Sequence, residues 1–263
     1  MTTVAPRAHS GGSAGSPVVR LGCAGLTKRF GGVLAVDDVS LEIDRSGVFG
    51  LCGFNGAGKS TLFALLAGAV RPDAGTVVLG GRDVTGLGSA QRSRLGLART
   101  WQRVRLAGDR TVLDNVAAGA VARPGQSMLV AFFRPGLALA RSRAATVLAE
   151  LGLTHLADQL AGNLTLEGQR LTELARALVS EPKVILADEP ASGLSAAQRQ
   201  VLAEMLSRLG TSRTVVLVEH DLDLLTSVAD HVWAMVSGRV AFSGAVAEFT
   251  VSEVHASLRG MRR

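Results

Sequence analysis

Short apolar segments recur along the first third of the chain, and their spacing predicts alternating strands and helices. Residues 39–43 (Val-Ser-Leu-Glu-Ile) alternate strictly between apolar and polar, which is typical of a half-buried strand. Residues 47–53 form an apolar run that ends in glycine, and we expect a buried strand there. Residues 60–70 place apolar side chains at helical spacing, and residues 76–84 fit a β-hairpin with a glycine pair at its turn.

The second half of the chain repeats the strand–helix–strand order after a segment of different character. Residues 112–178 are rich in Ala, Leu and Arg and contain few β-branched runs, so they predict a largely helical insert. Apolar strands are expected at 184–187 and 215–218, with a helix over 196–209 between them. Because strands that are buried on both faces read as continuous apolar runs, this order predicts an α/β fold with a parallel sheet covered by helices.

Composition narrows the class of protein. With 47% hydrophobic and 19% charged residues, the 263-residue chain is typical of a globular protein, and Cys23 and Cys52 are too few for a disulfide framework or a zinc site. No apolar run approaches the roughly 18 residues of a transmembrane helix. Residues 1–17 lack the apolar core of a signal peptide, and we predict a disordered tail there. We therefore expect a protein that is soluble inside the cell or is attached to a membrane only through a partner.

The net charge of +6 raises the question of a nucleic-acid partner. Arginines cluster between residues 82 and 110 and again at the C-terminus, but aromatic residues do not interleave with them as on a base-stacking surface. We predict a solvated basic face and no nucleic-acid site.

Candidate chemistry begins with residues 53–60 (Gly-Phe-Asn-Gly-Ala-Gly-Lys-Ser), which match the phosphate-binding pattern G-x-x-x-x-G-K-[ST] at every fixed position. The glycines let backbone N–H groups surround phosphate oxygens, and the following helix offers its positive N-terminus. We expect Lys59 to face solvent and reach the β- and γ-phosphates, and the Ser60 hydroxyl to bind Mg²⁺. A glycine turn with a chance lysine is the alternative, but the strand before and the helix after are the context that the motif requires.

Two further strands end in polar residues. The strand at 184–187 runs into Asp188 and Glu189, which predicts a carboxylate beside Mg²⁺ and a general base for the attacking water. His220 follows the strand at 215–218, where it could contact the γ-phosphate; a lone histidine there is otherwise a structural residue.

The order and spacing of these elements resemble the ATP-binding subunits of ABC (ATP-binding cassette) transporters over residues 18–263. Residues 26–40 resemble the opening of that family, 98–102 its Q-loop, 192–195 its D-loop and 219–221 its switch-histidine segment. The resemblance implies a P-loop NTPase core with a parallel sheet, an antiparallel β subdomain, and a helical signature subdomain at about residues 104–178.

The resemblance also implies a set of site residues. Phe30 would stack on adenine, and Gln102 would touch Mg²⁺ or the attacking water and act in catalysis with Glu189 and His220. The residues expected to hold ATP are Phe30, Gly53, Asn55, Gly56, Ala57, Gly58, Lys59, Ser60, Thr61, Thr165 and Gly168. The expected Mg²⁺ ligands are Ser60, Gln102 and Asp188.

One segment departs from the family pattern. The signature, Leu-Ser-Gly-Gly-Gln or a close variant, should precede the helix that contains 175–178, and its five places hold 164–168 (Leu-Thr-Leu-Glu-Gly). The register 165–169 looks closer to the signature, but it would rotate the apolar face of the helix by about 100°. In the register 164–168, Glu167 stands where the signature has its second glycine. Either its carboxylate opposes a partner's bound phosphate, which predicts an asymmetric pair with a different cassette, or it turns away as a tolerated variant.

The residues in and around the motifs resemble those of one subgroup, the ATP-binding subunits of branched-chain amino-acid importers. The residues that carry this likeness are 98–102, 111–116, 218–221 and 255–260. The likeness implies an ATPase at the cytoplasmic face of a membrane, bound to permease subunits and a second ABC ATPase subunit and served indirectly by a solute-binding protein. The alternatives are a soluble ABC-type ATP switch in DNA repair or translation, which usually carries tandem cassettes or a long coiled coil, and a P-loop kinase, which lacks the signature-like segment.

Overall fold

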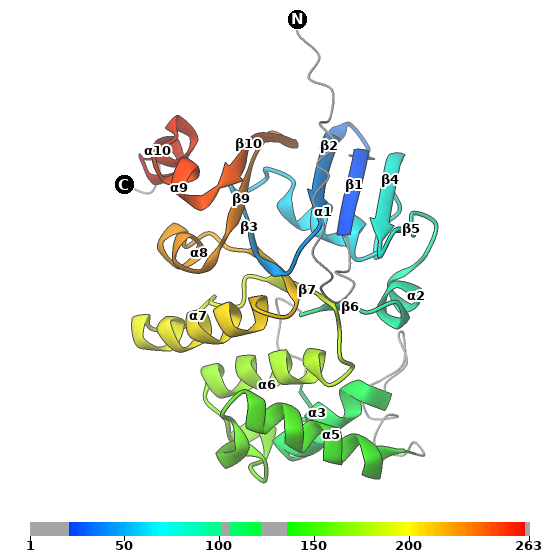
Figure 1. The fold of residues 1–263 in the computed structure, drawn as a ribbon, viewed down its shortest axis with the longest axis vertical. Helices are drawn as coiled ribbons and strands as arrows, with labels where there is room; N and C mark the ends of the chain where they lie inside the picture. Colours follow the sequence, from blue (N-terminus) through cyan, green and yellow to red (C-terminus); the bar gives the residue numbers. More distant parts are fainter. Residues whose placement is uncertain (1–20, 101–105, 122–135, 261–263) are drawn as a thin grey trace, which may run out of the picture.

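The computed structural model describes residues 21–100, 106–121 and 136–260, and most of their helices and strands are labelled in Figure 1. The strands are β1 (Leu21–Phe30), β2 (Val33–Ile43), β3 (Gly47–Gly53), β4 (Ala74–Leu79), β5 (Arg82–Asp83), β6 (Leu97–Arg99), β7 (Val184–Asp188), β8 (Thr214–Val218), β9 (His231–Val236) and β10 (Arg239–Ala245). The helices are α1 (Lys59–Leu66), α2 (Ser89–Arg94), α3 (Val112–Val121), α5 (Leu137–Glu150), α6 (Leu166–Leu178), α7 (Ala196–Gly210), α8 (Leu222–Val228), α9 (Val246–Thr250) and α10 (Glu253–Gly260), with 3-10 turns η1 (Thr154–Leu156) and η2 (Ala161–Asn163). The predicted tail at 1–17 lies outside the described residues.

The larger sheet of the described ranges has six strands in the order β10-β9-β3-β8-β7-β6. All neighbours in it pair in parallel except β10, which is antiparallel to β9. Alternate residues of β7 face opposite layers: Val184 and Leu186 pack with α1, whereas Ile185 and Ala187 pack with α6 and α7. Burial on both faces explains the continuous apolar runs, and the predicted parallel core is confirmed.

The smaller sheet is antiparallel, in the order β2-β1-β4-β5, and shares one hydrophobic core with α1 and the larger sheet. Its β4–β5 hairpin turns at Gly80 (φ 60°) and Gly81 (φ 78°), the left-handed backbone that glycine adopts without strain. The predicted hairpin is therefore confirmed.

Helix α1 is shorter than predicted, since it ends at Leu66 and not at residue 70. Gly68 adopts a φ of 72°, a left-handed conformation that ends a helix, and an added Cβ there would lie 2.7 Å from the Leu87 carbonyl oxygen. Arg92 is 1% exposed, and its guanidinium donates to the carbonyl oxygens of Leu65 and Leu66 at the end of α1. The prediction of a solvated arginine face between residues 82 and 110 is thus wrong for Arg92, which is a buried helix cap.

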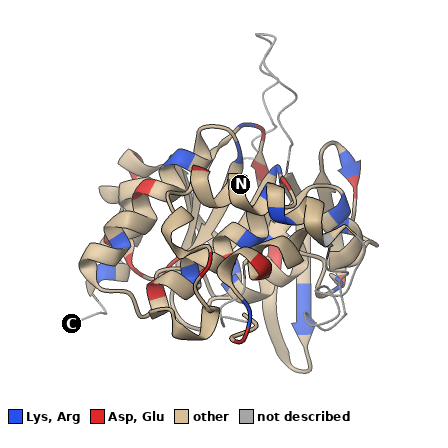
Figure 2. Cartoon of the chain, turned by 90° about the horizontal axis from the view of Figure 1, so that it is seen from below, with Lys and Arg blue, Asp and Glu red and all other residues tan. Residues whose placement is uncertain are grey.

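The middle of the chain is helical where the structure describes it, as predicted. Helices α3, α5 and α6 lie side by side below the sheets in Figure 1, and α7 lies between α6 and the larger sheet. Gly119 lets α3 approach α6 closely, because a Cβ there would lie 2.4 Å from the Arg176 carbonyl oxygen. Figure 2, which views the molecule from below, shows basic and acidic residues interspersed over this face. Among the described helices, none combines the length and the hydropathy that a membrane span requires.

Candidate active site

The predicted motifs meet at one edge of the larger sheet. Strands β3, β8 and β7 are parallel neighbours in register, with Leu51 opposite Val218 and Val218 opposite Asp188. Their carboxyl ends therefore lie together, and the three loops that follow them begin side by side. Residues that are far apart in the sequence are brought together here because the strands that carry them are adjacent in the sheet.

The loop after β3 contains two glycines at which any side chain would collide with neighbouring backbone atoms. A Cβ on Gly53 (φ 148°) would lie 2.4 Å from the Met235 carbonyl oxygen, and one on Gly58 (φ 98°) would lie 2.2 Å from that of Ala35. Gly58 is the N-cap of α1, and it provides no side chain to cap the first N–H groups of the helix. Asn55 and Gly56 are exposed at the tip of the loop. Such a helix start, with its partial positive charge, is suited to bind a phosphate.

Lys59 lies under this loop. Its Nζ donates to the carbonyl oxygens of Gly53 at 2.8 Å and Phe54 at 3.0 Å, and the residue is only 6% exposed. The expectation that Lys59 faces solvent is wrong, because a buried ammonium needs hydrogen-bond acceptors and the glycine-rich loop wraps around it and supplies them. Burial lowers the pKa of Lys59, while the nearby carboxylates of Glu189 and Asp188 act in the opposite direction. Lys59 is thus within electrostatic reach of both the predicted Mg²⁺ ligand Asp188 and the predicted general base Glu189.

Asp188, at the end of β7, forms an ion pair that the sequence analysis missed. The Nη2 atom of Arg99 donates to its Oδ2 at 2.8 Å, and the backbone N–H of Asp188 donates to the Oγ1 of Thr100 at 3.3 Å. The signal was the position of Arg99 within the Q-loop-like residues 98–102. Gln102 lies outside the described residues, so its predicted role stays a prediction.

The oxygen donors near the loop suit a hard cation. Ser60 is exposed in the first turn of α1, and Asp188 contributes a carboxylate from the end of β7, which is separated from β3 by β8. A hydroxyl and a carboxylate are donors that Mg²⁺ prefers when phosphates complete its shell. The residues present therefore fit the predicted ion.

Glu189 and His220 form a direct contact, with Oε2 of Glu189 2.9 Å from Nε2 of His220. Glu189 adopts a φ of 48°, which is uncommon for a residue with a side chain and turns the chain sharply after β7. Its backbone N–H donates to the carbonyl oxygen of Val218, which ties the turn to β8. The predicted general base and the predicted switch histidine therefore lie together at the end of adjacent strands.

Glu219 is a second residue that the sequence analysis did not single out. It is buried, its Oε1 accepts a hydrogen bond from the backbone N–H of Ala191 at 2.9 Å, and burial raises the pKa of its carboxyl group. Its place between an apolar strand and His220 was the only signal in the sequence. The contact holds the residues that follow Glu189 against the end of β8.

Phe30, at the end of β1, is 50% exposed, and the ammonium of Lys28 lies 5.5 Å from the centroid of its ring. It is therefore not a core residue. An exposed ring beside a cation could accept a flat aromatic ligand on its face.

The signature-like segment lies on the other face of the larger sheet from α1, because α6 packs in the core that α7 shares. Thr165 is the N-cap of α6, and its Oγ1 accepts a hydrogen bond from the N–H of Gly168 at 3.2 Å, which agrees with the register chosen from the sequence. The structure does not place these two residues in the cluster of Lys59, Asp188 and Glu189. Glu167 turns toward α7, where Gln198 donates to its Oε2 at 3.0 Å.

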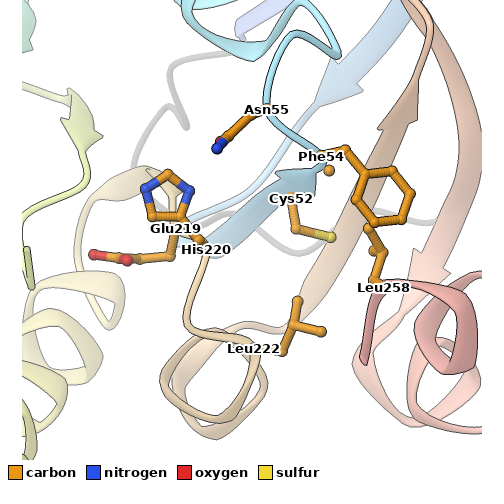
Figure 3. Close-up of a pocket in the computed structure, with 8 residues that line it drawn as sticks. Cys52, Phe54, Asn55, Glu219, His220, Leu222 and Leu258 are labelled. Carbon is orange, nitrogen blue, oxygen red and sulfur yellow. The ribbon is translucent and has the colours of Figure 1, made fainter. Parts of the chain in front are cut away.

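An open cavity of about 270 Å³ lies beside the loop (Figure 3). Asn55 and His220 lie on one side of it, and Cys52, Leu222 and Leu258 on the other. This space extends the phosphate-binding edge toward the C-terminal helices.

Comparisons with known proteins agree with this geometry. A family model described as ABC transporter matches residues 36–192, more than half of the chain. The chain is 37% identical over 230 residues to the high-affinity branched-chain amino acid transport ATP-binding protein LivG of Salmonella typhimurium, covering 84% of this chain and 89% of that protein. It is 38% identical over 232 residues to the phosphonates import ATP-binding protein PhnC of Rhodopseudomonas palustris, covering 87% and 85%. The crystal structure of the ADP conformation of MJ1267, an ATP-binding cassette of an ABC transporter, superposes with a TM-score of 0.82 at 28% identity, covering 92% of this chain and 98% of that one.

Proposed function

Because the chain belongs to the ABC transporter family and is an ATP-hydrolysing cassette, we propose that it powers a membrane importer for branched-chain amino acids. One observation carries the site assignment: the phosphate-binding loop, the Asp188–Glu189 pair and His220 converge at one edge of a parallel sheet. That edge is where ligands bind in sheets of this kind.

In the proposed site, the backbone N–H groups of the loop and the start of α1 hold the phosphates of ATP. Lys59 moves its ammonium from the carbonyl oxygens of Gly53 and Phe54 to the phosphates, a short change of partner for a flexible side chain. Phe30 stacks on adenine. Mg²⁺, held by Ser60, Asp188 and Gln102, would neutralise charge on the phosphates.

Hydrolysis is assigned to Glu189 and His220. The Glu189 carboxylate accepts a proton from the attacking water, and His220 holds that carboxylate through the contact at 2.9 Å. The turn at Glu189, tied to β8 on both sides, keeps the base in place.

The cassette is proposed to work as a pair, since Thr165 and Gly168 lie apart from Lys59 and would serve the nucleotide of a second ATPase subunit. Permease subunits would hold the pair at the cytoplasmic face of the membrane, with a solute-binding protein acting on the outside. We infer the solute from the Salmonella relative, a branched-chain amino acid transport ATP-binding protein. Because the Rhodopseudomonas phosphonates import protein has a similar identity to this chain, the test includes both solutes.

The test is reconstitution of the chain with candidate permease and solute-binding subunits in lipid vesicles. ATP-driven uptake of labelled leucine that is abolished by Glu189→Gln supports the proposal. Uptake of a phosphonate but not of leucine overturns the solute class. Co-purification with ribosomes or nucleic acid, without permease binding, favours the soluble ATP switch.

A further inference from the structure

The N-termini of α6 and α7 are joined through the side chains of Glu167 and Gln198. Glu167 is the second residue of α6, and its Oε2 accepts a hydrogen bond from Nε2 of Gln198, the third residue of α7, at 3.0 Å. A contact of this kind between a carboxylate and an amide is charge-assisted, and it is partly buried.

Both ends of the Gln198 amide are in use. While its Nε2 donates to Glu167, its Oε1 accepts from the backbone N–H of Ser195 at 2.8 Å. The Oγ of Ser195 in turn accepts from the N–H of Gln198, which completes the capping box of α7. Gln198 is therefore held at a fixed orientation, and it transmits the position of Glu167 to the loop that precedes α7.

A second, apolar contact joins the same two segments. Gly193 adopts a φ of 82°, and a Cβ there would lie 2.8 Å from Cδ2 of Leu166. Leu166, which directly precedes Glu167 in the sequence, thus packs onto the backbone of the loop at Gly193. The two contacts hold the loop at different residues. Together they therefore restrict both the position and the rotation of the loop.

The loop in question begins at the proposed general base. Residues 190–195 connect Glu189 to α7; their first part is bound to β8 through the Ala191–Glu219 hydrogen bond, and their last part is bound to α6 through Gln198. The Glu167 carboxylate also lies in the first turn of α6, where a helix dipole favours negative charge. Its charge is thus compensated within the chain.

We propose that Glu167 is a positioning residue that acts through Gln198 to fix the loop 190–195, and thereby Glu189, for ATP hydrolysis. This inference rests on the proposed function. Loss of the contact should leave nucleotide binding by the loop at 53–60 unchanged but misplace the base, which lowers kcat more than it changes KM.

The experiment measures ATPase kinetics of the assembled transporter that carries Glu167→Ala, Gln198→Ala or both, together with the thermal stability of each cassette. We expect each single variant to lower kcat by about three- to tenfold at unchanged KM, and the double variant to be no worse than either, because they break the same contact. Glu167→Gln should keep nearly full kcat, since its amide oxygen can accept from Nε2 of Gln198. The matched control is Gln200→Ala, which removes the exposed 3.2 Å hydrogen bond to Glu204 on the same helix and should not change kcat.

Glu167→Gly separates this proposal from the asymmetric-pair hypothesis. If Glu167 positions the loop, glycine lowers kcat as alanine does; if its carboxylate opposes a partner's phosphate, glycine raises it. Three results would each overturn the positioning role. They are a rise in kcat for Glu167→Gly, additive losses of kcat for Glu167→Ala and Gln198→Ala, and a loss of kcat for Glu167→Gln that equals the loss for Glu167→Ala. A wild-type assembly without ATPase activity would instead contradict the proposed function.

Discussion

The Nε2 atom of His220 lies 2.9 Å from the Oε2 atom of Glu189, although 31 positions separate the two residues in the sequence. Glu189 is nearly buried and His220 is partly open to the cavity beside the phosphate-binding loop. The carboxylate of Glu189 therefore has the imidazole of His220 as a direct partner from the end of the neighbouring strand.

The first prediction concerns the base. Glu189→Gln should bind ATP with unchanged affinity but hydrolyse it about 10²–10⁴-fold more slowly, because the amide keeps the shape of the side chain and cannot accept a proton. Single-turnover ATPase and equilibrium nucleotide binding measure the two effects separately. Near-normal turnover would show that another residue orients the water.

Lys59→Ala should abolish most nucleotide binding and hydrolysis while the protein stays folded. The variant loses two hydrogen bonds from a charged donor to loop carbonyl oxygens, worth about 1.5–3 kcal/mol each. It also removes the cost of burying the ammonium, so the net fall in thermal stability is expected to be modest. Lys59→Met is the control that keeps most of the buried side-chain volume. Wild-type hydrolysis by either variant would contradict the phosphate-binding assignment.

Phe30→Ala should raise the KM for ATP with little change in kcat, because stacking on adenine stabilises ground and transition states alike. The loss is about 1–3 kcal/mol by analogy with base stacking on aromatic residues. Since Phe30 is half exposed, the thermal stability of the alanine variant should differ little from that of the wild type. Phe30→Trp should retain the affinity for ATP. An unchanged KM for the alanine variant would remove Phe30 from the site.

Arg99→Met should strengthen the Mg²⁺ dependence of nucleotide binding. The variant removes the cation that holds Asp188 and leaves a buried carboxylate without that partner, which lowers thermal stability in the absence of Mg²⁺. Mg²⁺ with nucleotide should then raise the melting temperature of the variant more than that of the wild type. Arg99→Lys keeps the charge and serves as the control; equal Mg²⁺ effects in all three proteins would argue against competition for Asp188.

Glu219→Gln should raise thermal stability at neutral pH. Burial raises the pKa of Glu219 above its ordinary value of about 4.5, so the charged form destabilises the folded state at pH above that raised pKa. The amide removes this charge and can still accept the hydrogen bond from Ala191. The difference in melting temperature between variant and wild type should therefore shrink as pH falls through the raised pKa of Glu219 toward its ordinary value of about 4.5. A difference that does not depend on pH would show that the charge of Glu219 is not the cause.

Much of the fold followed from the sequence because its strands are buried on both faces. The runs at 47–53, 184–187 and 215–218 could only be central strands, and the motif at 53–60 required a strand before it and a helix after it. The glycine pair at residues 80 and 81 marked the hairpin for the same kind of local reason, since its backbone needs positive φ angles. The end of α1 was missed because Gly68 and the cap from Arg92 act together, and Arg92 is distant in the sequence.

The sequence by itself therefore determined the residue types at the site and the strands that carry them, because phosphate binding and buried strands impose strict local patterns. Only the tertiary structure decided how these residues are paired: Asp188 with Arg99, Glu189 with His220, and Glu167 with Gln198. A side chain at a strand end or helix start can turn toward any neighbour within reach. Which neighbour is within reach depends on the order of strands in the sheet and the packing of helices, and neither is written in the local pattern of a single segment.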